Sequence, residues 1–563
     1  MEFVRGRTWL SLCGSLSWAE ALPLIKQLLE TLAHAHARRI IHRDIKPENI
    51  LVEYISEDQM NAVLTDFGLS QALSELEKDS DIISGTPTYM APEQLEGNWR
   101  DQGPWTDLYS LGCTIWRLFC KTAPFGSNLS YPDACQKHTT AFIPPLQNLV
   151  SVPEDLEKWL CVFLAKDPNL RFQNAADALE ELLMFSNKMI PPYQQFEKKK
   201  ESPTQKNTLV LSAEPAPGTS FRTTQSVDKA SLSIPKTWKV RPPNRKPIHV
   251  HGVGLNLFEL RSFPFIGQIP IRDQLWNELI EVIRRGSRAV IIKGTEGTGK
   301  SHIAKWLCVR AEELGAAKTY RIQYSEQSNE RDGICKALRE AYRCQNLTRA
   351  EMTLRLQHIL KDNENLFQEI PKITSLLQPT DLSSEESIDL KEHERHGYML
   401  KLLMYSAQSY GKMITKPIIC WIDNAHQGLE GLRLCRSIIS SDYAQSIPIL
   451  FIITKSENLS KRHQERIEIA ALQNHHRCKN LQLSRISHED HKRICSSFID
   501  FSPSLLDELC RQTQGNPHYA KETIAEWIRQ KILVYSPQGF ILKEGSTFTV
   551  PKNIRKIPSN SNS

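Results

Sequence analysis

Long apolar runs are missing from this 563-residue sequence. The strongest runs, at residues 289–292, 418–422 and 447–453, are far shorter than the ~18–20 residues that a membrane-spanning helix needs. A signal-peptide pattern is also missing, because the first ten residues carry one acid and two arginines. No Cys-x-x-Cys pair occurs among the 13 cysteines, which disfavours a disulfide scaffold and a zinc knuckle. We therefore expect a cytoplasmic protein with reduced thiols and no membrane partner.

A large excess of charge of one sign is absent too. The sequence has 70 Lys and Arg against 64 Asp and Glu, so its net charge is only +6. This small charge gives no reason to expect nucleic acid as a partner. The hydrophobic share of 40% and the charged share of 24% are ordinary for a soluble globular protein. The length allows roughly four domains of ~150 residues.

Composition divides the chain into five segments. The first is apolar-rich and has helical spacing at 19–36 and at 106–119, where a glycine marks a close contact. The second is rich in Pro, Ser and Thr and should be a linker. The third alternates strand and helix patterns, the fourth is helical again, and the last should be a disordered tail. The segments are residues 1–186, 187–260, 261–480, 481–550 and 551–563.

The third segment should contain a parallel sheet. Its buried strands are expected at 289–293, 319–324, 418–422 and 448–454, and a helix is expected at 301–314. Strands that alternate with helices favour parallel pairing through crossover helices.

Three motifs in the first segment indicate phosphotransfer. They read HRDIKPEN at 42–49, DFG at 66–68 and GTPTYMAPE at 85–93. The carboxylate of Asp44 suits the attacking hydroxyl, and Lys46 suits the charge on the γ-phosphate. Asn49 and Asp66 suit Mg²⁺ held against the phosphates of ATP.

With these motifs the chain resembles the eukaryotic-type Ser/Thr protein kinases over residues 1 to about 185. The resemblance implies a mostly α kinase C-lobe in which Asp107 braces the catalytic loop and Glu93 pairs with Arg171. It also implies that Glu2 and Val4 belong to the hinge, whose backbone pairs with adenine.

Three other parts of a working kinase are missing from their place in the family pattern. These are a Gly-rich loop, a strand lysine and its partner glutamate, which precede the hinge in the family. The chain begins at the hinge, so we expect a truncated gene product that transfers phosphate to protein Ser/Thr only if the missing N-lobe is restored. A pseudokinase lobe used for docking is the alternative.

A second nucleotide motif reads GTEGTGKS at 294–301, between an expected strand and an expected helix. The glycines Gly294, Gly297 and Gly299 let backbone N–H groups face phosphates, and a helix N-terminus favours the anion. Lys300 suits the β- and γ-phosphates, and Ser301 suits Mg²⁺. The motif predicts a P-loop NTPase that binds ATP.

Two further residues should complete this second site. Asp423 follows a buried strand and should lie beside Ser301, where it would bind Mg²⁺ directly or through water. Thr454 ends the next expected strand.

The second half of the chain resembles the AAA-like ATPases of the STAND type that are fused to bacterial Ser/Thr kinases. The resemblance places residues 265–268 near adenine and Gly-Asn-Pro at 515–517 in a helical lid, and residues 533–542 could be the wing of a winged helix. The fold expected for the whole chain is therefore multidomain, with the kinase C-lobe followed by an α/β P-loop NTPase and a helical lid.

Asn424 departs from the resemblance, because many relatives carry a second acid there. Asparagine can orient water but cannot accept its proton at neutral pH, so hydrolysis should be slow. Slow turnover suits a switch, and the expected partners are a protein substrate and, through the ATPase domain, further copies of this chain. A kinase controlled by this switch and a scaffold that assembles with nucleotide remain the two alternatives.

Overall fold

The computed structural model describes most of the chain, and its residues form two compact units. One unit comprises Met1–Thr31, His42–Asn98 and Gln102–Asp228, and the other Leu32–Ile41, Trp99–Asp101 and Lys229–Ser563. No helix among the described residues has both the length and the apolar character needed to cross a bilayer. The described residues are 6–56, 59–67, 86–186, 234–240, 265–295, 297–324, 332–378, 390–407, 416–455, 463–497 and 499–546.

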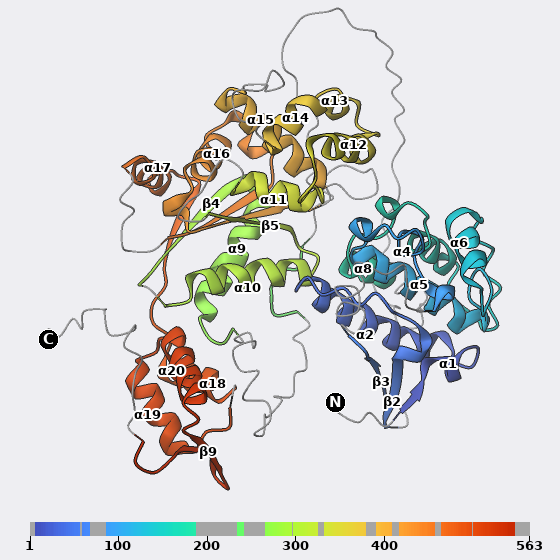
Figure 1. Ribbon diagram of the computed structural model, residues 1–563, viewed down its shortest axis with the longest axis horizontal. Coiled ribbons are helices and arrows are strands. Elements are labelled where there is room, and N and C mark those ends of the chain that lie inside the picture. The colour runs from blue at the N-terminus through green and yellow to red at the C-terminus, as the bar shows by residue number, and fades with distance from the viewer. Residues whose placement is uncertain are drawn as a thin grey trace, which may run out of the picture. The chain divides into compact units, whose positions relative to one another are not determined.

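The first unit is mostly helical, as predicted, and carries one small antiparallel sheet (Figure 1). The strands lie in the order β1 (Gly6–Thr8), β2 (Ile50–Ser56), β3 (Gln59–Leu64). No sequence pattern predicted β1 or β3. The helices are α1 (Trp9–Leu12), α2 (Trp18–His36), α4 (Pro92–Leu95), α5 (Pro104–Cys120), α6 (Tyr131–Thr140), α7 (Asp155–Phe163) and α8 (Ala175–Ser186).

Helix α5 is the buried centre of the first unit. It begins with proline at its first position, where the missing N–H costs nothing, and the residue that follows its last turn, Lys121, has a left-handed φ of 61°. Thirteen of its residues are buried. Gly112 lies against α7, because a Cβ at this position would come within 2.5 Å of the Phe163 Cβ. The glycine therefore marks a close helix contact, as the sequence predicted.

Gly112→Ala should destabilise the first unit by about 1–3 kcal/mol, because the added methyl overpacks the contact with Phe163. Hydrogen exchange of the α5 amides would report this loss. The control is Gly397→Ala, since an added Cβ there meets no atom within 4 Å. That variant should stabilise its own helix by up to ~1 kcal/mol, and equal effects at both positions would contradict the packing argument.

The second unit is built on a parallel five-stranded sheet, which confirms the predicted sheet. The strand order is β5-β6-β7-β4-β8, and every neighbouring pair is parallel. The central strands are buried on both faces, so they read as continuous apolar runs. The strands are β4 (Arg288–Lys293), β5 (Lys318–Gln323), β6 (Ile418–Asp423), β7 (Ile449–Thr454) and β8 (Cys478–Gln482).

Helices cover both faces of this sheet (Figure 1). α9 (Ile269–Arg285) and α10 (Lys300–Glu313) pack on one face, where Leu279 and Ile303 meet strand residues such as Val290. The remaining helices of this part are α11 (Ile334–Ala341), α12 (Arg349–Leu360), α13 (Glu364–Phe367), α14 (Ile370–Leu377), α15 (Glu392–Ser406), α16 (Leu429–Ile439) and α17 (His463–Gln473).

The C-terminal part of the second unit has three helices and a hairpin around one apolar cluster, which includes Trp527 and Phe540. The hairpin pairs β9 with β10 at the residues expected to form a wing. The elements are α18 (His488–Ser496), α19 (Pro503–Thr513), α20 (Pro517–Arg529), β9 (Leu533–Ser536) and β10 (Gly539–Leu542).

Residues 234–240, inside the segment predicted as a linker, pack against the second unit. The Trp238 indole Nε1 donates a 2.7 Å hydrogen bond to the Asp273 carboxylate. The Trp276 Nε1 donates to the Pro235 carbonyl at 2.9 Å. This short part of the predicted linker is therefore attached to α9.

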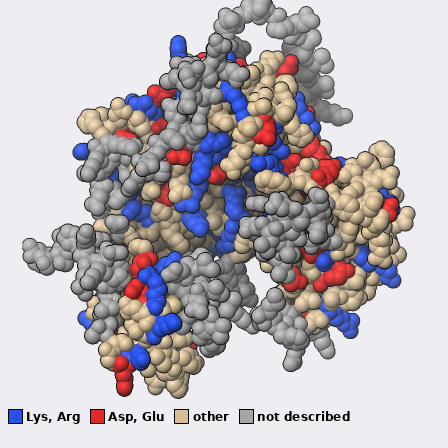
Figure 2. All heavy atoms as spheres, in the orientation of Figure 1, with Lys and Arg blue, Asp and Glu red and all other residues tan. Residues whose placement is uncertain are grey.

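Charges of both signs share the described surface. On the face that Figure 2 shows, Lys and Arg side chains gather near the middle, with Asp and Glu side chains among them. This mixture agrees with the small net charge of +6.

Candidate functional site

The loop at residues 42–49 is fastened to helix α5 by a buried carboxylate. Asp107 is 1% exposed and accepts hydrogen bonds from the backbone N–H of His42 at 2.8 Å and of Arg43 at 2.7 Å. Arg43 has a left-handed φ of 68°, which an L-residue adopts only when its surroundings hold it there. The arrangement suits the bracing role expected of Asp107.

Polar side chains from this loop converge on Asp44. The Lys46 Nζ lies 2.8 Å from the Asp44 Oδ2, and the Asn49 Nδ2 donates to the same oxygen at 3.0 Å. Asn49 also donates to the Asp44 carbonyl at 2.8 Å. The Asp44 side chain is 32% exposed, so it can reach a hydroxyl from solvent. A carboxylate, an ammonium group and an amide therefore share one small site.

Asp66 follows strand β3 and is exposed. Its φ of 64° is left-handed, and the next residue, Phe67, packs edge-on against His42 with ring centroids 4.6 Å apart. This contact keeps the start of the DFG motif beside the loop that holds Asp44. The two expected hinge residues, Glu2 and Val4, lie outside the described residues.

A buried ion pair stabilises the first unit away from these polar groups. Two nitrogens of Arg171 donate to the two oxygens of Glu93, at 2.8 and 3.0 Å. The Thr106 hydroxyl donates to the same carboxylate at 2.7 Å. Both charged side chains are at most 2% exposed. This geometry suits the structural role expected for the pair.

In the second unit, the loop between β4 and α10 has a backbone that requires glycine. Gly294, Gly297 and Gly299 have φ values of 159°, 79° and 93°. The Lys300 Nζ donates to the carbonyls of Gly294 at 2.8 Å and Thr295 at 2.7 Å, so the lysine folds over its own loop. The helix N-terminus and the ammonium group together favour an anion at this loop.

Three oxygen-bearing side chains meet at the carboxyl end of the sheet. The Ser301 Oγ and the Thr454 Oγ1 each donate a 2.7 Å hydrogen bond to the Asp423 Oδ1. Asp423 is 4% exposed and Thr454 is 2% exposed. Carboxylate and hydroxyl oxygens are ligands that Mg²⁺ prefers, so this donor set fits the ion.

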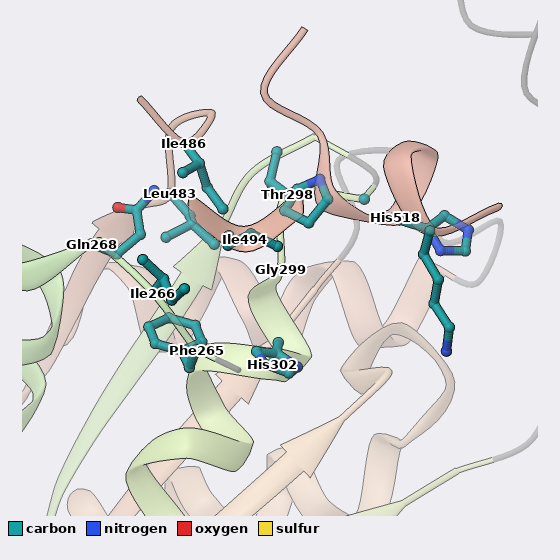
Figure 3. Close-up of a pocket in the computed structure, with 13 residues that line it drawn as sticks. Phe265, Ile266, Gln268, Thr298, Gly299, His302, Leu483, Ile486, Ile494 and His518 are labelled. Atoms are coloured by element: carbon teal, nitrogen blue, oxygen red, sulfur yellow. The ribbon is translucent and has the colours of Figure 1, made fainter. Parts of the chain in front are cut away.

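A cavity of about 250 Å³ opens beside the glycine loop (Figure 3). Its walls come from the segment before α9, from the loop and α10, and from the C-terminal helical part. A Cβ at Gly297 would lie 2.6 Å from the Asn516 side chain, so loop and C-terminal helices are in close contact. The lining residues are Phe265, Ile266, Gln268, Gly297, Thr298, Gly299, His302, Leu483, Ile486, Ile494, Pro517, His518 and Lys521.

Aromatic rings form one wall of this cavity. Phe265 stacks on His302 and on Trp306, with ring centroids 5.3 and 5.8 Å away. The Arg272 guanidinium lies 4.4 Å from the Trp306 ring and 3.7 Å from the Trp238 ring. Burial lowers the pKa of Arg272 to about 10, which leaves it charged at neutral pH. The Phe265 side of the cavity is therefore a packed surface of aromatic rings.

Comparisons with known proteins bear on the first unit. The family described as protein kinase domain matches residues 1–184. The serine/threonine-protein kinase PrkC of Bacillus subtilis (strain 168) is 34% identical over 182 residues, which are 31% of this chain and 27% of PrkC. Residues 1–184 are a Ser/Thr protein-kinase-like region. The serine/threonine-protein kinase PknB of Mycobacterium leprae (strain TN) is 31% identical over 189 residues, 32% of this chain and 29% of that protein.

The chain thus spans less than a third of the length of these two kinases. Among solved structures, the Rad53 kinase domain and SCD2 in complex with AMPPNP is 25% identical, with a TM-score of 0.26. That alignment covers 35% of this chain and 71% of the other.

In the kinase-like region the structure brings the expected site residues Asp44, Lys46 and Asn49 together. In the second unit the sequence analysis missed several cavity residues. The position of His302 could have been predicted from the sequence, because it follows Ser301 directly on a helix. Leu483 and Ile494 had none, since apolar residues of this kind usually serve a core.

Proposed function

We propose that this chain is a Ser/Thr protein-kinase-like signalling protein whose second unit is an AAA/STAND-type P-loop ATPase that acts as a nucleotide switch. The observation that supports this most is the meeting of Ser301, Asp423 and Thr454 beside the glycine loop. Such a cluster at the carboxyl edge of a parallel sheet is where open α/β folds bind ligands.

Different residues of the second unit would bind the phosphates of ATP, the Mg²⁺ ion and the adenine ring. Backbone N–H groups at Gly297 and Gly299 would face the phosphates, and Lys300 would exchange its two carbonyl partners for phosphate oxygens. Ser301 and Asp423 would hold Mg²⁺, which neutralises phosphate charge. The cavity lined by Phe265 would take the adenine ring.

For the kinase-like region we propose phosphotransfer from ATP to a protein Ser or Thr, a reaction for which protein kinases also use a Gly-rich loop, a strand lysine and a glutamate. Asp44 would accept the hydroxyl proton, Lys46 would offset phosphate charge, and Asn49 and Asp66 would hold Mg²⁺. The close contacts around Asp44 support these roles.

A scaffold that forms homo-oligomers according to its nucleotide is the second candidate. Asn424 favours it, because its exposed side chain directly follows Asp423 and cannot serve as a base at neutral pH. For either function we propose a cytoplasmic location, which is supported by the 13 cysteines, since none of them forms a disulfide in the part of the chain that the structure describes.

Lys300→Ala should weaken ATP binding to the second unit by about 30- to 100-fold, because a charged partner of the phosphates is lost. Calorimetric titration of the full chain with ATP and Mg²⁺ would measure it. Lys305→Ala changes an exposed lysine on the same helix and should bind like the wild type.

Asp44→Ala and Asp66→Ala, tested alongside, would identify any binding that comes from the kinase-like region. Nucleotide affinity that ignores Lys300 but depends on Asp66 would refute the proposed switch.

A further inference from the structure

Asp423 has a charged neighbour that the sequence analysis did not consider. The Arg321 NH2 lies 3.3 Å from the Asp423 Oδ2, whereas Ser301 and Thr454 both donate to the other oxygen. Arg321 lies on β5 directly opposite Trp421 of β6. The parallel pairing of the two strands therefore brings a guanidinium group to the carboxylate at the sheet edge.

The two members of this ion pair differ in their freedom to move. The side chain of Asp423 is 6% exposed, whereas that of Arg321 is 50% exposed. The Arg321 guanidinium also lies 4.6 Å from the centroid of the Trp421 ring, an attractive contact that does not depend on Asp423. The charge of the buried Asp423 carboxylate is thus balanced by the Arg321 guanidinium, which can move away and still be solvated.

We infer that Arg321 is a positioning residue that compensates the charge of Asp423 in the nucleotide-free protein and releases it when Mg²⁺ and nucleotide bind. The inference rests on the proposed nucleotide switch. A divalent ion held by Ser301 and Asp423 would lie next to the guanidinium, and two cations so close repel each other. Arg321 would then remain on the Trp421 ring and turn its charge to solvent.

This exchange couples the ion to strand β5. Mg²⁺ would compete with Arg321 for the charge of the same carboxylate group, so part of its binding free energy would be used to break the ion pair. Without Arg321 the carboxylate would be open to the ion. The opposite arrangement, in which Arg321 contacts the phosphates, would make the arginine a contributor to nucleotide affinity.

Arg321→Met separates the two arrangements, because it keeps much of the length and the apolar contact with Trp421 but removes the charge. Calorimetric titration of the full chain with ADP should show about fivefold tighter binding in Mg²⁺, a size typical of a partly exposed ion pair. Binding of ADP in EDTA should stay unchanged. Arg321→Lys should resemble the wild type, since it keeps a cation.

A thermal melt gives a readout independent of affinity. In EDTA, the melting temperature of Arg321→Met should be lower than that of the wild type. On addition of Mg²⁺ and ADP, its melting temperature should rise by more than that of the wild type. Arg284→Met, at an arginine that is 70% exposed and pairs with Glu281, is the matched control and should change neither measurement.

The outcomes distinguish this inference from the proposed function. Weaker or unchanged binding by Arg321→Met in Mg²⁺, with wild-type binding that still requires Lys300, would overturn the role of Arg321 alone. Nucleotide binding that depends neither on Mg²⁺ nor on Lys300 would refute the proposed switch, and this inference would fail with it.

Discussion

Replacing Arg171 with methionine should destabilise the first unit by about 3–5 kcal/mol, the cost of leaving a buried charge without its partner. Glu93 would keep the hydrogen bond from Thr106 but would lose both guanidinium contacts. Neither charged side chain is more than 2% exposed, so water cannot replace those contacts. Hydrogen exchange of the α5 amides, followed in urea, would measure the loss in this unit separately.

A surface ion pair provides the control for this prediction. Lys158 is 83% exposed and lies 3.5 Å from Asp155, and pairs of this kind contribute only ~0–1 kcal/mol. Lys158→Met should therefore leave the exchange of α5 nearly unchanged. Adding Glu93→Leu to Arg171→Met should recover part of the stability, because the lone charge is then removed. No recovery would mean that the loss comes from altered packing.

The local motifs could be predicted from the sequence because their geometry depends on near neighbours. Lys46 and Asn49 reach Asp44 across at most five residues. The glycines at 294–299 are found where the backbone has a positive φ, which glycine adopts most easily. The long-range contact between Ser301 and Asp423 was also accessible, since strands of a parallel sheet end at one edge.

Features that depend on strand register or on packing could not be predicted from the sequence. Arg321 reaches Asp423 because β5 pairs with β6 in one register, which no local pattern specifies. Strand β8 is polar, with one buried residue, Leu481, so it lacks the apolar run that revealed its neighbours. Trp238 lies in a proline-rich segment whose composition conceals its packing against α9.

Asn424→Asp should raise ATP hydrolysis by roughly 10- to 100-fold, because the new carboxylate can accept the proton of an attacking water. Asn424 follows Asp423 at the end of β6, and its side chain is exposed. Its φ of 53° and ψ of 45° are left-handed, a conformation that both asparagine and aspartate tolerate. The substitution therefore changes the chemistry with little strain. Phosphate release under single-turnover conditions, with Mg²⁺ present, is the measurement.

Asn424→Gly is the matched control, because glycine also adopts the left-handed conformation but brings no base. It should hydrolyse ATP no faster than the wild type, and Asn424→Asp combined with Lys300→Ala should lose the gain. A rate that stays flat in Asn424→Asp, with ATP affinity intact, would mean that water is not activated beside β6. The asparagine could then not be the reason for the slow hydrolysis that the proposed switch requires.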